Sequence, residues 1–184
     1  MKFHLMTIDK FYILDKYKKI KYEEHNIKNM LHKEGEEYIL NALFKDSQSI
    51  PVNGYYVGLD VRPTFDKNDT LSEIIGEPTV NGYRRQNVPL SNWSLQISND
   101  VWFAKSGTII FSAINDQGTD TGWGPVTNIF LATTNERCER MPGSCVGKLI
   151  SSAKLGSSVS IGNKESVVME MSLSLYDHRP PQTF

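Results

Sequence analysis

The residues best able to do chemistry here include two cysteines, Cys138 and Cys145, in one predicted loop. Six residues separate them, which differs from the C-x-x-C spacing of zinc and redox sites. Two free thiols, as a reducing cytoplasm would favour, and a disulfide that closes the loop are both compatible with the sequence. We therefore predict no metal site at the cysteines and leave the choice between thiols and disulfide open.

The histidines and carboxylates show no recognisable catalytic pattern. His25 and His32 lie seven residues apart in a predicted helix, and no H-E-x-x-H motif is present. The acidic pair at 23–24, like the one at 36–37, is adjacent in sequence, so its side chains diverge on a helix. The loop at 66–70 lacks the glycine and the glutamate of a calcium-binding loop. We predict no catalytic, cofactor-binding or metal-binding residues, and we do not expect an enzyme.

The overall composition limits the classes of partner. The 184 residues fit one domain with extensions. A formal net charge of -1 argues against whole-molecule attraction to nucleic acid. No apolar run approaches the roughly 18 residues that span a bilayer, and the N-terminus lacks a signal-peptide pattern. We expect a protein that is made in a cytoplasm and does not bind membranes.

The main structural element is a strand close to the C-terminus. Between 167 and 176, mostly polar residues alternate with Val167, Met169, Met171, Leu173 and Leu175, which places an aliphatic row on one face of a strand. Turn signals about every ten residues precede it, with β-branched and aromatic residues between them. The pattern predicts a mainly β protein, an antiparallel sandwich or jelly roll spanning residues 51–176.

The two ends of the chain are predicted to lie outside this sandwich. Residues 1–22 mix lysines with apolar side chains too irregularly for a clear element, and we predict an arm. It could pack as an edge strand on its own domain, lie on a neighbouring subunit or contact nucleic acid. Residues 23–50 approach a period of 3.6 and predict one helix packed on the sandwich. Residues 177–184 contain two prolines and predict a short extended tail.

Several segments, in this order and spacing, resemble a group of small virion proteins of tailed bacteriophages. Each segment is short, and together they cover roughly residues 27–176. The matching pieces follow the predicted helix and are Y-V-G-L at 56–59, the leucine-containing helix at 71–75, N-G-Y-R-R at 81–85, W-G-P-V-T at 123–127, G-K-L-I at 147–150, V-S-I-G at 159–162 and L-S-L at 173–175. Residues 1–22 and the loop at 135–145 depart from the pattern.

The resemblance implies a β-sandwich building block of a virion that is assembled in the host cytoplasm. Our first expectation is a capsid decoration, or cement, protein that forms homo-oligomers, with trimers one possibility, and binds the major capsid protein or other virion proteins. A neck, tail or fibre-attachment protein is the alternative. The apolar residues of the predicted arm and tail would supply the interface: Phe3, Leu5, Phe11, Tyr12, Leu14, Tyr17 and Phe184.

A carbohydrate-binding module is an alternative from a different class of function. Trp93, Trp102 and Trp123 could provide stacking platforms for a sugar. Trp123 lies between Gly122 and Gly124-Pro125, and we expect it to anchor a loop in the core instead. An exposed, coplanar pair of tryptophans would favour sugar binding.

Overall fold

The computed structural model describes residues 3–45, 51, 53–80, 82–98, 100–114, 122–137 and 145–177, with side chains from Thr7 to Ser174. Within these residues there are ten strands and one α-helix. The elements are β1 (Phe3–Leu14), β2 (Ile20–Leu31), α1 (Lys33–Phe44), β3 (Tyr55–Asp60), β4 (Gln86–Val88), β5 (Trp93–Ser98), β6 (Val101–Ser106), β7 (Ile109–Ser112), β8 (Trp123–Ala132), β9 (Leu149–Ile161) and β10 (Ser166–Asp177).

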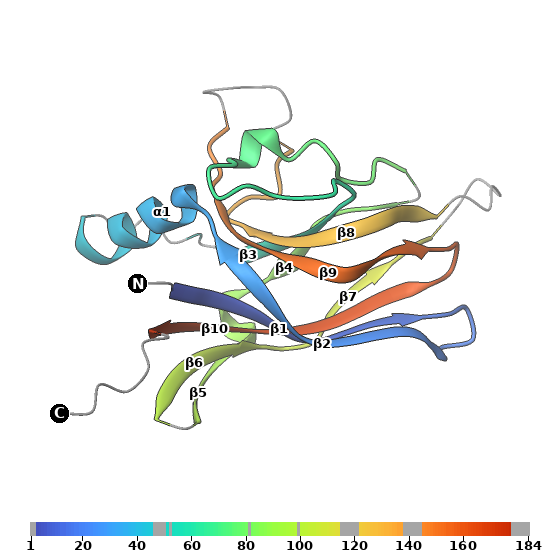
Figure 1. Cartoon of the computed structure of the whole chain (residues 1–184), viewed down its shortest axis with the longest axis horizontal. Coiled ribbons are helices and arrows are strands. Elements are labelled where there is room, and N and C mark those ends of the chain that lie inside the picture. The colour runs from blue at the N-terminus through green and yellow to red at the C-terminus, as the bar shows by residue number, and fades with distance from the viewer. Residues whose placement is uncertain are drawn as a thin grey trace.

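The strands form one antiparallel sheet that curls into a nearly closed barrel. Their order is β4-β3-β8-β9-β2-β1-β10-β6-β5, and β7 pairs with the other end of β10. In Figure 1, β8 and β9 lie above β1, β2 and β10, and β2 bends from the lower layer to the upper one. The last residues of β2 pair with β9, from Asn29 opposite Ala153 to Leu31 opposite Ser151, while earlier residues pair with β1. The predicted mainly β, antiparallel fold with one helix is therefore confirmed.

The inner face of the curled sheet holds the main hydrophobic core. Side chains of β1, β7 and β10 meet those of β3, β8 and β9, and Phe11, Phe111, Leu59 and Ile129 are fully buried. The predicted alternation in β10 is confirmed, because Val167, Met169 and Met171 are all fully buried in this core. A sheet that curls in this way buries one face without a second independent domain.

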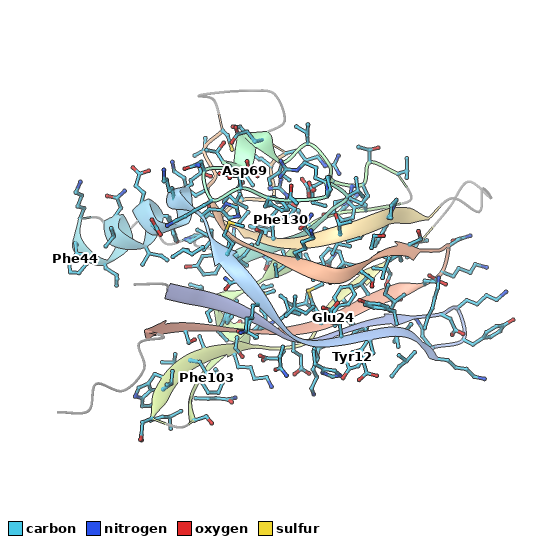
Figure 2. All side chains as sticks on the ribbon, viewed as in Figure 1. Tyr12, Glu24, Phe44, Asp69, Phe103 and Phe130 are labelled. Atoms are coloured by element: carbon cyan, nitrogen blue, oxygen red, sulfur yellow. The ribbon has the colours of Figure 1, made fainter. Side chains whose placement is uncertain are left out.

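A second, smaller cluster lies on the outer face of β8 and β9. Phe130 and Leu149 point outward from these strands and are covered by Phe65, Leu71 and Ile74 of the segment that follows β3. Figure 2 shows Phe130 between the strands and this covering segment. A short 3-10 helix at Leu71–Glu73 forms part of the cover, and Thr70 and Glu73 close it with a capping box. Both faces of the second half of β8, from Asn128 to Ala132, are therefore buried.

The N-terminal segment differs from the prediction. For residues 1–22, the expected packing on the same domain is confirmed, but β1 lies between β2 and β10 and not at an edge of the sheet. The helix expected at 23–50 was wrong in its first part, because β2 extends to Leu31 and α1 begins only at Lys33. The period of two is hidden because β1 has a register shift between Ile8 and Lys10, and Asn26 of β2 has a positive φ of 54°. Ile8 and Phe11 therefore face the core although they are three residues apart.

Candidate assembly surface

Among the described residues, the β5–β6 hairpin carries three large exposed apolar side chains, as many as helix α1. Its strands pair without a bulge from Trp93 opposite Ser106 to Ser98 opposite Val101, so only two residues form the turn. Asp100 in this turn has a φ of 61°, as tight hairpin turns require. Aromatic and β-branched residues on both strands favour the extended conformation. The hairpin is thus a local structure with a well-defined register.

One face of this hairpin is apolar and largely open to solvent. Leu95, Ile97 and Trp102 are 77%, 56% and 63% exposed, and Trp102 lies directly opposite Ile97. Because residues opposite each other in an antiparallel pair share a face, Leu95 also lies beside Ala104. We call Leu95, Ile97, Trp102 and Ala104 the hairpin face.

The hairpin face continues the core face of the sheet. Ala104 pairs with Leu173 of β10, and both Leu173 and Trp93 pack against the main core. Beyond these residues the hairpin extends past the body of the barrel, toward the lower left in Figure 1. Figure 2 labels Phe103 on this projecting hairpin. Core-type side chains therefore run out of the protein interior onto a surface that the described residues leave uncovered.

Helix α1 presents further exposed apolar side chains. Its inner side is held by Tyr38, which is buried and meets the ring of Tyr55 edge to face. Tyr55 meets Trp93 of β5 in the same way, so three aromatic rings link the helix to the hairpin. On the outer side, Leu43 and Phe44 are exposed, and Figure 2 shows Phe44 at the far end of the helix. Large exposed apolar areas of this kind are typical of sites that bind other proteins.

The residues predicted to form the interface lie elsewhere. Phe11 is 0% exposed and belongs to the core, so its place in an interface was wrong. Tyr12 and Leu14 are half-buried on β1, and Tyr17, in the turn after it, is exposed. Phe3 and Leu5 are in β1, but their side chains are outside the described set, as is the whole of Phe184.

Leu95 and Ile97 are absent from the predicted interface, although the sequence marks them. In Trp93–Ser98 apolar and polar residues alternate and no residue is charged. That alternation predicts a strand with one apolar face, but not whether another element covers the face. The apolar face of β5 is exposed because this strand lies at the end of the sheet, a position that the alternation does not reveal.

The three tryptophans do not form a stacking platform. Trp123 is buried as predicted, and its indole nitrogen donates to the carbonyl of Val80 at 3.0 Å. Trp93 is half-buried, and Trp102 alone is exposed. Trp102 pairs with Ile97, four residues along β5 from Trp93, so these two rings are separated by roughly 13 Å of strand.

The segment before β4 is fixed by a buried ion pair. Arg85 Nη2 lies 2.7 Å from Glu77 Oε2, and both side chains are almost fully buried. Arg85 Nη1 also donates to the carbonyls of Thr134 and Glu136, each at 2.9 Å. The hydroxyl of Tyr83 donates to Glu77 at 3.0 Å, and burial raises the pKa of this tyrosine. The charged and polar groups of Glu77, Tyr83 and Arg85 form hydrogen bonds with one another and with backbone carbonyls, which is typical of a structural network and not of an open binding site.

A second polar network holds the covering segment at its start. Asp60 is fully buried and accepts hydrogen bonds from the backbone of Arg62 at 2.8 Å and of Gly76 at 3.2 Å. Burial raises the pKa of this carboxyl group, against the opposing effect of Arg62.

His32, just before α1, is also buried, and its Nε2 lies 2.8 Å from the hydroxyl of Ser152. Burial lowers the pKa of His32, which therefore favours the neutral ring.

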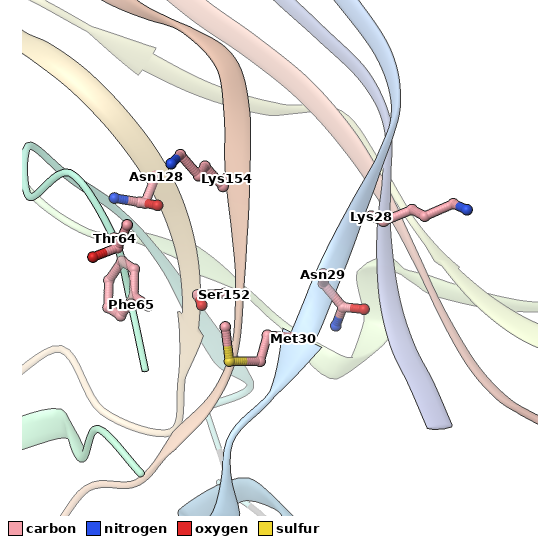
Figure 3. Close-up of a pocket in the computed structure, with 8 residues that line it drawn as sticks. All are labelled: Lys28, Asn29, Met30, Thr64, Phe65, Asn128, Ser152 and Lys154. Carbon is pink, nitrogen blue, oxygen red and sulfur yellow. The ribbon is translucent and has the colours of Figure 1, made fainter. Parts of the chain in front are cut away.

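A groove of about 240 Å³ lies where β2, β9 and the covering segment meet. Its lining includes Lys28, Met30, Asn128, Ser152 and Lys154. In Figure 3 the amine of Lys154 lies on the side of Asn128, whereas Lys28 points away from both. The two lysines thus do not converge on one point, as an anion site would require. The other lining residues are Asn29, Thr64 and Phe65.

The remaining chemical candidates give no further site. Cys145 is disulfide-bonded, and Cys138 lies outside the described residues. No group of three or more histidine, cysteine, aspartate or glutamate side chains within the described ranges is placed to hold a metal ion. No helix in that part of the chain is long and apolar enough to cross a membrane. The chain matches no protein-family model and no curated protein.

Proposed function

We propose that this chain is a structural subunit that docks onto a larger assembly through the hairpin face. The observation that carries the proposal is the exposed continuation of the core face on β5 and β6, at Leu95, Ile97 and Trp102. Burying one such side chain contributes roughly 1.5–3 kcal/mol, so the three together provide a sizeable apolar anchor. The chain as a whole has nearly balanced charge, with Lys+Arg 20 against Asp+Glu 21.

The setting we propose is the virion of a tailed bacteriophage, on the sequence resemblance alone. In that setting the chain is a decoration protein bound to the outside of the head, with the major capsid protein as its partner. The curled sheet would serve as the rigid body, packed in the manner of a sandwich, and the hairpin would be the docking element. Because many copies bind to one lattice, the contacts of neighbouring subunits add to the apolar anchor that each hairpin face provides.

A neck, tail or fibre-attachment protein would use the same surface on a different partner. The proposed docking element does not distinguish these positions, because an apolar hairpin can dock on any shell or collar subunit of matching shape. The distinction lies in the partner and is settled by the binding experiment below.

The experiment compares binding of the purified chain to preassembled heads that lack it. The wild-type chain should co-sediment with the heads at saturable stoichiometry, and Trp102→Asp should lose this binding while it remains folded. Ile110→Asp is the matched control, because Ile110 is a half-exposed strand residue on β7, away from the hairpin. Equal binding of Trp102→Asp and wild type would overturn the proposal. Binding to isolated necks or tails and not to heads would replace decoration by the alternative position.

A further inference from the structure

Strand β5 is an open edge of the sheet in the described structure. It is last in the strand order, and its only described partner is β6. Proteins commonly protect such edges with a lysine, a proline, a bulge or an inward-pointing charge. The six residues Trp93–Ser98 include none of these residue types, and their pairing with β6 is regular.

The outward-facing backbone groups of this edge follow from the hairpin register. In a hairpin with a two-residue turn, the pair that closes the turn, here Ser98 and Val101, is hydrogen-bonded. Hydrogen-bonded and non-hydrogen-bonded pairs then alternate along the ladder. Trp93, Leu95 and Ile97 therefore direct their N–H and C=O groups toward the open edge.

We propose that a second copy of this chain pairs antiparallel with β5 about a two-fold axis through Leu95. In this register Leu95 lies opposite the second copy's Leu95, and Trp93 lies opposite its Ile97. Ser94 then lies opposite the second copy's Gln96. Each outward-facing residue exchanges two hydrogen bonds with its opposite residue, which gives about six across the edge. Apolar side chains meet apolar ones on one face, and polar side chains meet polar ones on the other.

The edge fits itself better in this register than in its nearest competitor. A two-fold axis through Gln96 would also keep the faces matched, but it would place Trp93 opposite the turn and leave its outward groups without a strand partner. Since Trp93–Ser98 carries no charge, neither register brings like charges together. The register through Leu95 alone pairs Trp93, Leu95 and Ile97 at once.

The inference rests on the proposed role as an assembly subunit and deepens it. Joining two copies at β5 places their hairpin faces side by side on one continuous sheet, which doubles the apolar surface offered to the shell. An antiparallel pair of identical strands requires two-fold symmetry, so this edge cannot join three copies around a three-fold axis. A dimer becomes the docking unit.

The first test measures the mass of the full chain by light scattering over a range of concentrations. Wild type should be a dimer at high concentration, and Leu95→Lys should shift the dissociation constant upward at least tenfold because it places two like charges opposite each other. Ile110→Lys adds the same charge away from the edge and should remain dimeric. A wild type that is monomeric at all concentrations, or a Leu95→Lys variant that dimerises equally well, would overturn the inference.

The second test fixes the register by cysteine cross-linking, with a mild oxidant and non-reducing electrophoresis. Opposite Cα atoms in an antiparallel pair are about 5.5 Å apart, which allows a disulfide. Leu95→Cys should give a cross-linked dimer, while Gln96→Cys, displaced by two residues from its copy, should not. Cross-linking of Gln96→Cys in place of Leu95→Cys would overturn the proposed axis.

The two proposals fail in different ways. A dimer that cross-links at Leu95→Cys but does not bind heads, necks or tails upholds the two-fold edge and rejects the docking role. A chain that is monomeric at all concentrations but binds heads through Trp102 rejects the edge and upholds the docking role.

Discussion

The buried ion pair between Glu77 and Arg85 gives the sharpest quantitative prediction. Replacing Glu77 with glutamine keeps the shape of the side chain but removes its charge. Arg85 would then remain buried without a counter-ion, because its other described acceptors are the uncharged carbonyls of Thr134 and Glu136. Breaking a buried pair in this way typically costs about 3–5 kcal/mol.

The hydrogen-bond geometry gives a similar magnitude. Arg85 Nε donates to Glu77 Oε1 at 3.0 Å and Nη2 donates to Oε2 at 2.7 Å. Hydrogen bonds to charged groups contribute about 1.5–3 kcal/mol each, so two of them correspond to roughly 3–6 kcal/mol. For a domain of this size, the loss of 3–5 kcal/mol lowers the melting temperature by roughly 6–20 °C.

The assay is equilibrium unfolding in urea, with the midpoint and slope measured for each variant. Glu36→Gln is the matched control, because the pair of Glu36 with Lys67 at 2.7 Å is exposed and should contribute about 0–1 kcal/mol. The double variant Glu77→Gln with Arg85→Met should be more stable than Glu77→Gln alone, since it removes the unpaired charge. A loss below about 1 kcal/mol for Glu77→Gln would refute the reasoning.

Two further predictions concern the N-terminal strands and the response to acid. Phe11→Ala should lower the free energy of unfolding by about 3–5 kcal/mol because Phe11 lies in the core. Tyr17→Ala, in the exposed turn, should change it by less than about 0.5 kcal/mol. Equal effects of the two substitutions in thermal unfolding would contradict the position of β1 in the sheet. Because burial lowers the pKa of His32 below 6.5, the unfolded chain binds a proton on acidification that the folded chain resists, so stability should fall below about pH 6.5 by up to about 1.4 kcal/mol per pH unit. His32→Gln should reduce this slope, measured as melting temperature between pH 7.5 and 5.5, and the exposed His25→Gln should retain it; identical slopes for His32→Gln and wild type would contradict the assignment.

The strands that alternate strictly could be predicted from the sequence, and those with irregular backbone could not. β10 was predictable because Val167, Met169 and Met171 keep a period of two. In β1 the register shift after Ile8 makes Phe11 the next core residue. A spacing of three differs from the period of two of a regular strand, and on its own it is too short a pattern to indicate a helix. In β2 a single residue, Ile27, is buried, and its spacing to Met30 and Leu31 matches a helix.

The candidate surface was less predictable than the fold. The sequence marks Leu95 and Ile97 as one face of a strand, but burial depends on which strands lie across from that face in three dimensions. The predicted interface was placed on the N-terminal segment because its apolar residues, mixed with lysines, follow no regular period and therefore indicated an arm. Of these lysines, Lys10 and Lys21 are exposed on β1 and β2, and Lys16, Lys18 and Lys19 lie in the turn between the two strands. Lys10 lies 3.8 Å from Glu170 of β10.

The pairing of β1 with β10 also sets the order of events during synthesis. Leu14 of β1 pairs with Ser166 of β10, so the two strands cannot pair until about 150 further residues have been synthesised. This takes roughly 8–30 s at 5–20 residues per second. Over that interval the edge of β1 that faces away from β2 has no strand partner, and the sheet cannot complete its curled form. β10 also pairs with β6, through Ser172–Ser174, and so attaches the β5–β6 hairpin to the sheet. A nascent chain therefore acquires its nearly closed barrel and the attachment of its β5–β6 hairpin to the sheet at the same late stage of synthesis.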